Sequence, residues 1–184
     1  MEEESVYREK LYNQIQEEYG RLTYTYTTHN KEAGILKRKY KRLRVTEIVL
    51  SAATSAGVFG GIFWDAHWVK GASVVVSFLT IVVQAFLNGR KYETEIQQHI
   101  GAANALWLLR EEYLSLMTDF ERIDVESAAR KRNELQRRTA EIYNMTPQTS
   151  AEAYAMAQKA LKEDEEQFFS QEELNRMLPE KLRK

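Results

Sequence analysis

The sequence of 184 residues contains no cysteine and only two prolines and three histidines. The absence of cysteine excludes disulfides, thiolate zinc sites and cysteine nucleophiles, but it does not indicate a redox compartment. His29, His67 and His99 are dispersed, and no HExxH motif or other metal-ligand spacing is present. A glycine-rich phosphate loop and a nucleophile elbow are also missing. We therefore expect no enzymatic activity, no metal site and no cofactor.

Neither sign of charge is in marked excess, because 26 basic and 27 acidic residues give a net charge of -1. The overall charge therefore gives no indication of nucleic-acid binding. The first residues, Met1–Glu4, are acidic rather than basic, and no apolar core follows them. We expect no signal peptide here, so that internal segments direct the chain to a membrane. The length is that of one domain, and residues 1–184 are expected to form a single unit.

Two long runs lack Asp, Glu, Lys and Arg altogether: Ile48–Trp64 and Gly71–Gly89. As helices they would span roughly 25 and 28 Å, close to the thickness of a hydrocarbon core of about 30 Å. Only the hexapeptide Asp65–Lys70 separates them, which favours antiparallel neighbours. The pattern predicts an all-α membrane protein with a two-helix transmembrane hairpin over residues 45–89. Cytoplasmic helices are expected over residues 5–44 and 90–184. The alternative is a buried hairpin inside a soluble bundle.

Basic residues flank both outer ends of this predicted hairpin. They are Lys37, Arg38, Lys39, Lys41, Arg42 and Arg44 before the first run, and Arg90 and Lys91 after the second. The positive-inside rule then places both termini in the cytoplasm and the short connection outside. Trp64 and Trp68 lie where interfacial aromatic anchors are expected. The cluster at residues 37–44 could instead bind nucleic acid, but its position favours contact with anionic headgroups.

The second run carries a polar stripe at helical spacing, formed by Ser73, Ser77, Thr80, Gln84 and Asn88. Polar groups within a membrane are expected to face protein or water. The stripe could line a water-filled pore formed by several copies. Alternatively, it could hydrogen-bond to the first helix or to carbonyls of its own helix. The sequence does not decide between these.

Small residues recur along the first run in two rows, Ala53/Gly57/Gly61 and Ala52/Ala56/Gly60. Small side chains let helix backbones approach closely in lipid. We expect these rows to mediate close helix contacts, either within one hairpin or between hairpins.

Apolar periodicity predicts further helices on both sides of the hairpin. In the N-terminal region the row is Leu11, Ile15, Tyr19, Leu22 and Tyr26. The second span is expected to continue as one long cytoplasmic helix. Its row is Ile96, Ile100, Ala103, Trp107, Leu114 and Met117, and it runs on toward Phe120 and Ile123.

Capping signals predict three more helices in the C-terminal region. Asp124–Ser127 precedes a basic helix over about residues 128–144, which contains Arg130, Lys131, Arg132, Arg137 and Arg138. Thr149 with Glu152, and Ser170 with Glu173, have the spacing of a capping box. The acidic group at residues 163–166 is a possible counterpart of the basic helix.

The cytoplasmic region resembles the SLATT family. The residues that carry this resemblance are His99, Ala103, Trp107, Arg110, Tyr113 and Asp119, then the tract 129–136, then Glu141–Tyr143, Thr149, Ala153, Tyr154, Ala157, Ala160–Lys162, Phe169–Leu174, Leu178 and Pro179. Asn133 stands where the pattern is expected to carry Asp. The likeness covers most of the chain, and its motifs are loosely spaced helix patterns.

The resemblance implies a membrane effector of a bacterial conflict system. Such proteins have two transmembrane helices and are proposed to form pores that disable an infected cell. On this basis we expect an inner-membrane protein that assembles into homo-oligomers. Its trigger would be a nucleotide second messenger or a partner sensor protein. The competing class is a non-conducting, membrane-anchored interaction or sensor protein.

Overall fold

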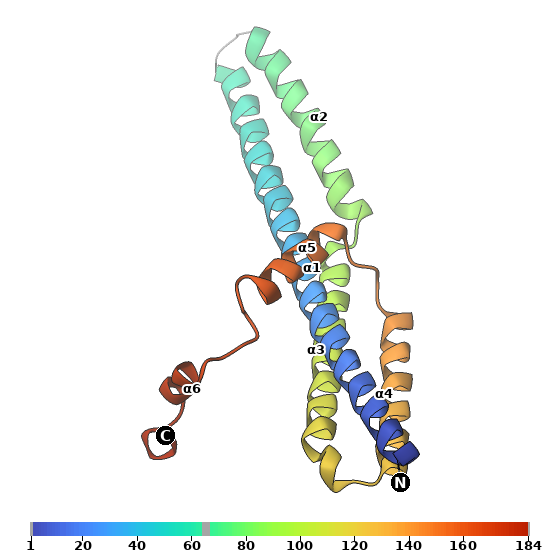
Figure 1. Cartoon of the computed structure of the whole chain (residues 1–184). Helices are drawn as coiled ribbons and strands as arrows, with labels where there is room; N and C mark the ends of the chain where they lie inside the picture. The colour runs from blue at the N-terminus through green and yellow to red at the C-terminus, as the bar shows by residue number, and fades with distance from the viewer. Residues whose placement is uncertain (1, 64–66, 184) are drawn as a thin grey trace. The chain divides into compact units, whose positions relative to one another are not determined.

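The computed structural model describes residues 2–63 and 67–183. It contains α1 (Glu2–Phe63), α2 (His67–Gly89), α3 (Tyr92–Asp119), α4 (Val125–Met145), α5 (Ala151–Lys162) and α6 (Gln171–Met177), with short 3-10 helices η1 (Phe120–Arg122) and η2 (Glu180–Leu182) (Figure 1). The described ranges contain no strand, which confirms the all-α class. The chain divides into two compact units. We call Met1–Glu32 with Gly101–Lys184 the bundle unit, and Ala33–Ile100 the paired-helix unit.

The bundle unit is built on the predicted apolar face of α1. Leu11, Ile15, Leu22 and Tyr26 are buried, and Tyr19 packs beside them. These side chains pack against α3 and α4 in one hydrophobic core, to which α4 contributes Ala128 and Leu135. The threonine-rich stretch Thr23–Thr28 continues this helix without a break. Its hydroxyls donate to carbonyls one turn earlier, as that of Thr27 does to Thr23 at 2.8 Å.

Most of the predicted apolar row of α3 is confirmed: Ile96, Ala103 and Phe120 are buried, and Ile100, Met117 and Ile123 pack against core residues. The core also contains Leu106, Leu109, Tyr113 and Leu116 of α3, which the predicted row omits. By contrast, Trp107 is 48% exposed and Leu114 40% exposed, so the prediction was wrong at these positions. Both rows are apolar at helical spacing, so periodicity alone could not choose between them. The neighbours α1 and α4 decide which row is buried.

Caps predicted from the sequence are partly confirmed in this unit. The Asp124 carboxylate accepts from the Ser127 N–H at 2.8 Å and begins α4. For α5, however, the cap is Ser150 rather than Thr149. The Ser150 hydroxyl accepts from the Ala153 N–H at 3.2 Å. Small buried side chains then let α5 pack closely: Ala153, Ala157 and Ala160.

The last helix, α6, has its predicted capping box but buries none of its residues. The Glu173 carboxylate accepts from the Ser170 N–H at 2.8 Å, and the Ser170 hydroxyl accepts from the Glu173 N–H at 3.2 Å. In the acidic group before α6, Glu166 pairs with Lys31 of α1 at 2.8 Å. This acidic residue therefore offsets a charge on α1 and not one on the basic helix α4.

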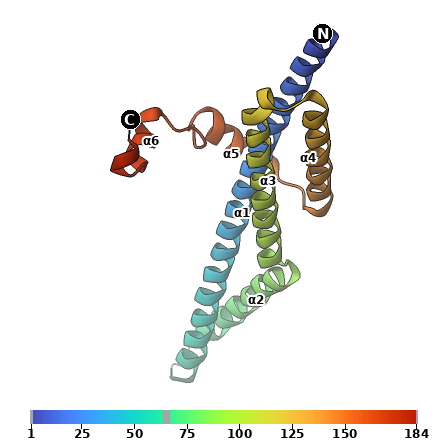
Figure 2. The same ribbon diagram turned by 90° about the horizontal axis from the view of Figure 1, so that it is seen from below.

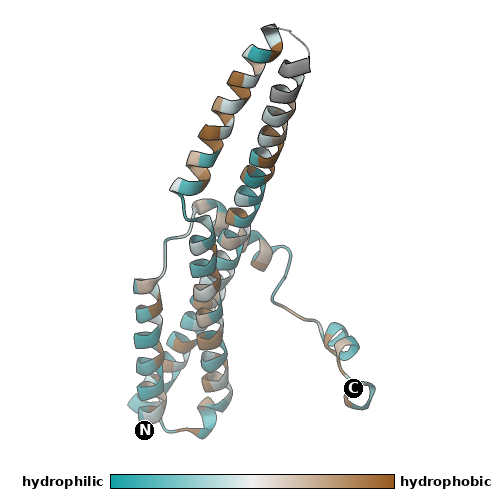
Figure 3. Ribbon diagram, turned by 180° about the vertical axis from the view of Figure 1, so that it is seen from behind, coloured by the Kyte–Doolittle hydropathy of each residue, from teal (hydrophilic) through white to brown (hydrophobic). Residues whose placement is uncertain are grey.

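In the paired-helix unit, α2 runs back alongside the last part of α1 (Figures 1 and 3). The expectation that the second span continues unbroken into the next helix was wrong, because α2 ends at Gly89 and α3 begins at Tyr92. The Tyr92 N–H donates to the Arg90 carbonyl at 2.9 Å, which turns the chain at this junction (Figure 2). Tyr92 and Ile96 are then buried against Leu36 of α1. This apolar contact stabilises the turn.

Candidate functional site

The helix α2 is the most apolar segment of the structure. A window in the helical run Trp68–Arg122 has a mean hydropathy of 1.8, and none of it is buried. By length and composition this run can cross a membrane, and it is the one such run among the described residues. Its exposed side chains include Val74, Phe78 and Ile81, at 70%, 64% and 63%. Figure 3 shows this apolar character along the ribbon.

The structure divides the predicted polar stripe of α2 into two parts. The hydroxyls of Ser73, Ser77 and Thr80 are partly buried and donate to carbonyls of their own helix at 2.8 to 2.9 Å. Gln84 and Asn88 are exposed. The first three side chains are thus satisfied within the helix. Within residues 2–63 and 67–183, the amide groups of the last two make no hydrogen bond, and they lie at the end of an apolar segment.

The two small-residue rows of α1 do not form two uniform contact faces. Gly57 lies against Ser73, and Gly60 lies near Val69 of α2, at 4.0 Å from an added Cβ. Ala52, Ala53 and Ala56 are exposed, and the surroundings of Gly61 lie outside the described contacts. The glycine contacts in this structure are therefore within one chain. The three alanines remain available to lipid or to another copy.

The predicted interfacial basic residues are all exposed. Arg44 pairs with Glu47 at 3.0 Å. In the described part of the chain, no ion pair involves five of the others: Lys37, Arg38, Lys39, Lys41 and Arg42. Trp68 is 77% exposed, and Trp64 lies outside the described residues. The basic segment thus has uncompensated positive charge.

A feature that the sequence did not reveal lies at the junction between α2 and α3. Tyr40 stacks on Tyr92, with ring centroids 5.8 Å apart and planes inclined by 27°. The Arg44 guanidinium lies over Tyr40 and that of Arg90 over Tyr92, at 5.5 and 5.0 Å. The Tyr40 hydroxyl donates to Glu93 at 2.8 Å. Two arginine–tyrosine pairs thus meet where α2 ends.

Hydrogen bonding raises the pKa of both of these arginines. Bonds to Tyr40 and Glu47 raise the pKa of Arg44 above its ordinary value. A bond to Glu95 at 3.0 Å raises the pKa of Arg90 in the same way. Aromatic residues at this spacing give no motif in the sequence. Only the fold brings positions 40 and 92 together.

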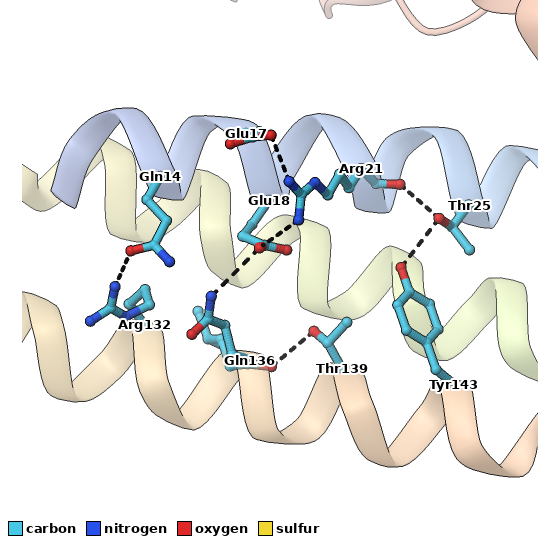
Figure 4. Close-up of polar contacts among 10 residues, drawn as sticks. Gln14, Glu17, Glu18, Arg21, Thr25, Arg132, Gln136, Thr139 and Tyr143 are labelled. Atoms are coloured by element: carbon cyan, nitrogen blue, oxygen red, sulfur yellow. Dashed lines mark hydrogen bonds and ion pairs between the residues drawn. The ribbon is translucent and has the colours of Figure 1, made fainter. Parts of the chain in front are cut away.

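In the bundle unit, a row of polar contacts joins α1 to the basic helix α4 (Figure 4). Arg132 donates to Gln14, Gln136 donates to Glu18 at 3.5 Å, and the Thr25 and Tyr143 hydroxyls lie 3.2 Å apart. The remaining basic side chains of α4 have acidic partners: Arg130 with Glu126, Lys131 with Glu112 and Glu134, Arg137 with Glu141, and Arg138 with Glu112. Four of the five basic side chains of α4 are thus paired with carboxylates within the bundle unit, and Arg132 binds neutral amides instead.

Arg110, one of the residues that carry the SLATT resemblance, lies between two tyrosine rings. Its guanidinium is 5.1 Å from the ring centre of Tyr19 and 5.8 Å from that of Tyr26. It donates to the Tyr19 hydroxyl at 2.8 Å and to Glu111 at 2.7 Å. Burial raises the pKa of Tyr26, which keeps this phenol neutral. Arg110 therefore holds α3 against α1.

Asn133, which replaces the expected Asp, accepts from its neighbour Arg132 at 2.8 Å. A neutral amide thus serves as the acceptor at this position. Among the described residues, no three His, Asp or Glu side chains converge as metal ligands would.

The comparisons identify one family. The model of SMODS and SLOG-associating 2TM effector domain family 4 matches residues 11–173. No curated protein and no solved structure matches the chain. The family match covers most of both units, including the apolar α2 and the capped helices α4 and α5, and it ends within the first turn of α6. The chain therefore belongs to SMODS and SLOG-associating 2TM effector domain family 4, and it is a membrane effector of conflict systems.

Proposed function

We propose that the end of α1 and α2 cross the bacterial inner membrane as a hairpin, and that several copies assemble into a pore when triggered. One hairpin cannot enclose a channel, so the pore requires an oligomer. The family description, with its two transmembrane segments, supports the hairpin. The exposed apolar side chains of α2 support it independently, because a large apolar surface in contact with water is unfavourable for a monomer.

The observation that carries the pore proposal is the exposure of Gln84 and Asn88. Burying an amide group in hydrocarbon without a hydrogen-bond partner costs roughly several kcal/mol of free energy, so both side chains should face protein or water. Ser73, Ser77 and Thr80 extend the same stripe. In an assembly the stripe would line or gate the water-filled path.

The orientation that we propose follows from the basic segment 37–44, in which Arg44 pairs with Glu47, together with Arg90 and Lys91. Positive charge at the outer ends of both spans places the termini in the cytoplasm. The bilayer would then be the first partner of the protein, and further copies of the chain the second.

The trigger we propose is a nucleotide second messenger or a partner sensor protein. The support is the family description, which associates these domains with SMODS and SLOG proteins. The bundle unit, with its helices outside the membrane, would receive the signal.

The test is dye release from liposomes that contain the purified full-length protein. We expect Gln84→Leu with Asn88→Leu to reduce dye release strongly, because these substitutions remove both amide groups from the lining of the water-filled path. Val75→Leu with Ile81→Leu is the matched control on an exposed apolar part of α2, and it should conduct as the unsubstituted protein does. Equal release from all three proteins would contradict the pore.

A second candidate is a non-conducting anchor whose helices dock a partner. The observation in its favour is that Ser73, Ser77 and Thr80 already bond within α2. A mass measurement of the detergent-solubilised protein separates the two candidates. A strict monomer would exclude the pore and leave the anchor.

A further inference from the structure

The junction between α2 and α3 contains a small polar cavity of about 250 Å³. Its lining includes three basic residues, Arg44, Arg90 and Lys91, and one acidic residue, Glu93. Pockets for drug-sized ligands measure about 300–1,000 Å³, so this cavity suits a smaller group. Its charge favours an anion.

The guanidinium groups that line this cavity keep donors free for a ligand. Arg44 uses Nε for Tyr40 and Nη1 for Glu47, at 3.1 and 3.0 Å. Arg90 uses Nε and Nη2 for Glu95. Within the described part of the chain, Nη2 of Arg44 and Nη1 of Arg90 make no hydrogen bond. Each of the two planar guanidinium groups therefore keeps one nitrogen that can donate to a ligand.

The geometry of these donors is fixed by aromatic contacts. Each guanidinium lies over a tyrosine ring, and the two rings stack on each other. Tyr92 is only 8% exposed, so its ring cannot move freely. Pre-organised arginines match the oxygen geometry of phosphate particularly well. Lys91 adds an exposed charge without an ion pair in the described residues.

Acidic groups also face this region, and they limit which anions can bind. The Glu47 carboxylate accepts a hydrogen bond from Arg44, and the Glu95 carboxylate accepts one from Arg90. The Glu93 carboxylate accepts from the Tyr40 hydroxyl. These carboxylates offset part of the basic charge, so a ligand must be recognised by directed hydrogen bonds as well as by its charge. A phosphate group, with several acceptor oxygens, can use the free arginine donors and Lys91 together.

We propose that this cavity binds a phosphate group, carried by a phospholipid headgroup or by a soluble phosphate compound. The lipid source rests on the proposed membrane location, whereas the soluble source does not. With a headgroup bound, the cavity would fix the end of α2 at the membrane surface. The site would then be a defined headgroup site and not part of a diffuse basic surface.

The first experiment compares lipid binding by native mass spectrometry, using full-length protein in detergent. The probes are phosphatidylglycerol and a diacylglycerol with the same chains but no phosphate. We expect Arg44→Gln with Arg90→Gln to reduce bound phosphatidylglycerol about tenfold, as the loss of charge-assisted donors implies. The matched control is Arg38→Gln with Arg42→Gln, which removes the same charge outside the cavity. Because neither Arg38 nor Arg42 lines the cavity, this control should reduce phosphatidylglycerol binding clearly less than the cavity pair does.

A milder pair keeps the test valid if the arginine variant does not fold. Lys91→Gln removes a cavity charge that makes no ion pair in the described residues, and Lys39→Gln removes one outside the cavity. We expect about threefold weaker binding for the first and no change for the second. Equal losses in cavity and control variants would overturn the proposal, because they would indicate a diffuse surface. No loss in any variant would also overturn it.

The second experiment identifies the source of the phosphate. Inorganic phosphate is added to lipid-free protein, with chloride at matched ionic strength as the control, and the unfolding temperature is measured. Stabilisation by phosphate that Lys91→Gln abolishes supports a soluble compound. Headgroup binding without this stabilisation supports the lipid. Dye release by the same variants is a separate result: normal release with no phosphate binding would reject the cavity and keep the pore.

Discussion

The Ser73 hydroxyl occupies the space that a side chain on Gly57 would need. A Cβ built on Gly57 would overlap Ser73 Oγ and would lie 3.4 Å from Ser73 Cβ. Gly71, in the same pair of helices, has nothing within 4 Å of such a Cβ. Close approach therefore requires glycine at position 57 but not at position 71.

We predict that Gly57→Ala lowers the unfolding temperature of the detergent-solubilised protein, with a cost of about 1–3 kcal/mol from overpacking. Ser73→Ala removes the overlapping oxygen, so adding it to Gly57→Ala should restore the stability. Gly71→Ala is the control, and it should be neutral or stabilising by up to about 1 kcal/mol through helix propensity. If positions 57 and 71 respond alike, the two helices do not pack here as described.

A second prediction concerns Ser150, the cap of α5. The buried Glu32 carboxylate accepts from the Ser150 N–H at 2.8 Å and from its hydroxyl. Ser150→Ala removes that hydroxyl and the cap together, and it should reduce the free energy of unfolding by about 2 kcal/mol. Thr149→Ala, one position earlier, should change it by less than about 0.5 kcal/mol. Chemical denaturation of the full chain measures both, and a larger loss at Thr149 would contradict this assignment of the cap.

The contacts of Arg110 predict that lysine cannot replace it. Lysine keeps the charge but loses the planar group that lies between Tyr19 and Tyr26. Arg110→Lys should therefore destabilise the protein by about 1–2 kcal/mol. The control is Arg137→Lys, at an arginine whose side chain is 65% exposed and pairs with Glu141. Its effect on the unfolding temperature should be close to zero, and an equally small effect at Arg110 would reject the proposed ring contacts.

The ion pair between Glu112 and Arg138 predicts a dependence of stability on pH. The hydrogen bond from Arg138 lowers the pKa of Glu112 below its ordinary value of 4.5. Because the pKa is lower in the folded state, the stabilisation is complete above the unfolded pKa and is lost as pH falls through the folded one. Glu112→Gln should therefore reduce the loss of stability on acidification below about pH 4.5.

The control for this prediction is Glu126→Gln, which removes a carboxylate whose side chain is 90% exposed. Thermal unfolding between about pH 7 and about pH 3 compares the two variants. An unchanged pH profile in Glu112→Gln would show that this pair does not contribute.

The helices themselves could be predicted because their signals are local. The α1 face from Leu11 to Tyr26 and the caps at Asp124 and Ser170 each depend on residues within a few positions of one another. Contacts between residues far apart in the sequence determine details that local patterns do not predict. Ser150 rather than Thr149 caps α5 because Glu32, 118 positions away in the sequence, binds it.

The candidate site could be predicted only in part, for a similar reason. Uncharged runs and flanking basic residues indicate a membrane segment without any knowledge of the fold. Whether a hydroxyl such as that of Ser77 bonds to its own helix depends on backbone geometry. The stacking of Tyr40 on Tyr92 depends on the break between Gly89 and Tyr92, and the sequence pattern predicted no break there.

The capped helix α6 has a consequence for how the sequence can change. Its capping box and the ion pair of Glu172 with Arg176 are formed entirely by its own residues. Since none of its residues is fully buried and none belongs to the apolar core, replacing this segment removes no contact from the core of the bundle unit. Residues 170–177 can therefore be exchanged for a different recognition sequence, or carry a fluorescent label, at little cost to folding.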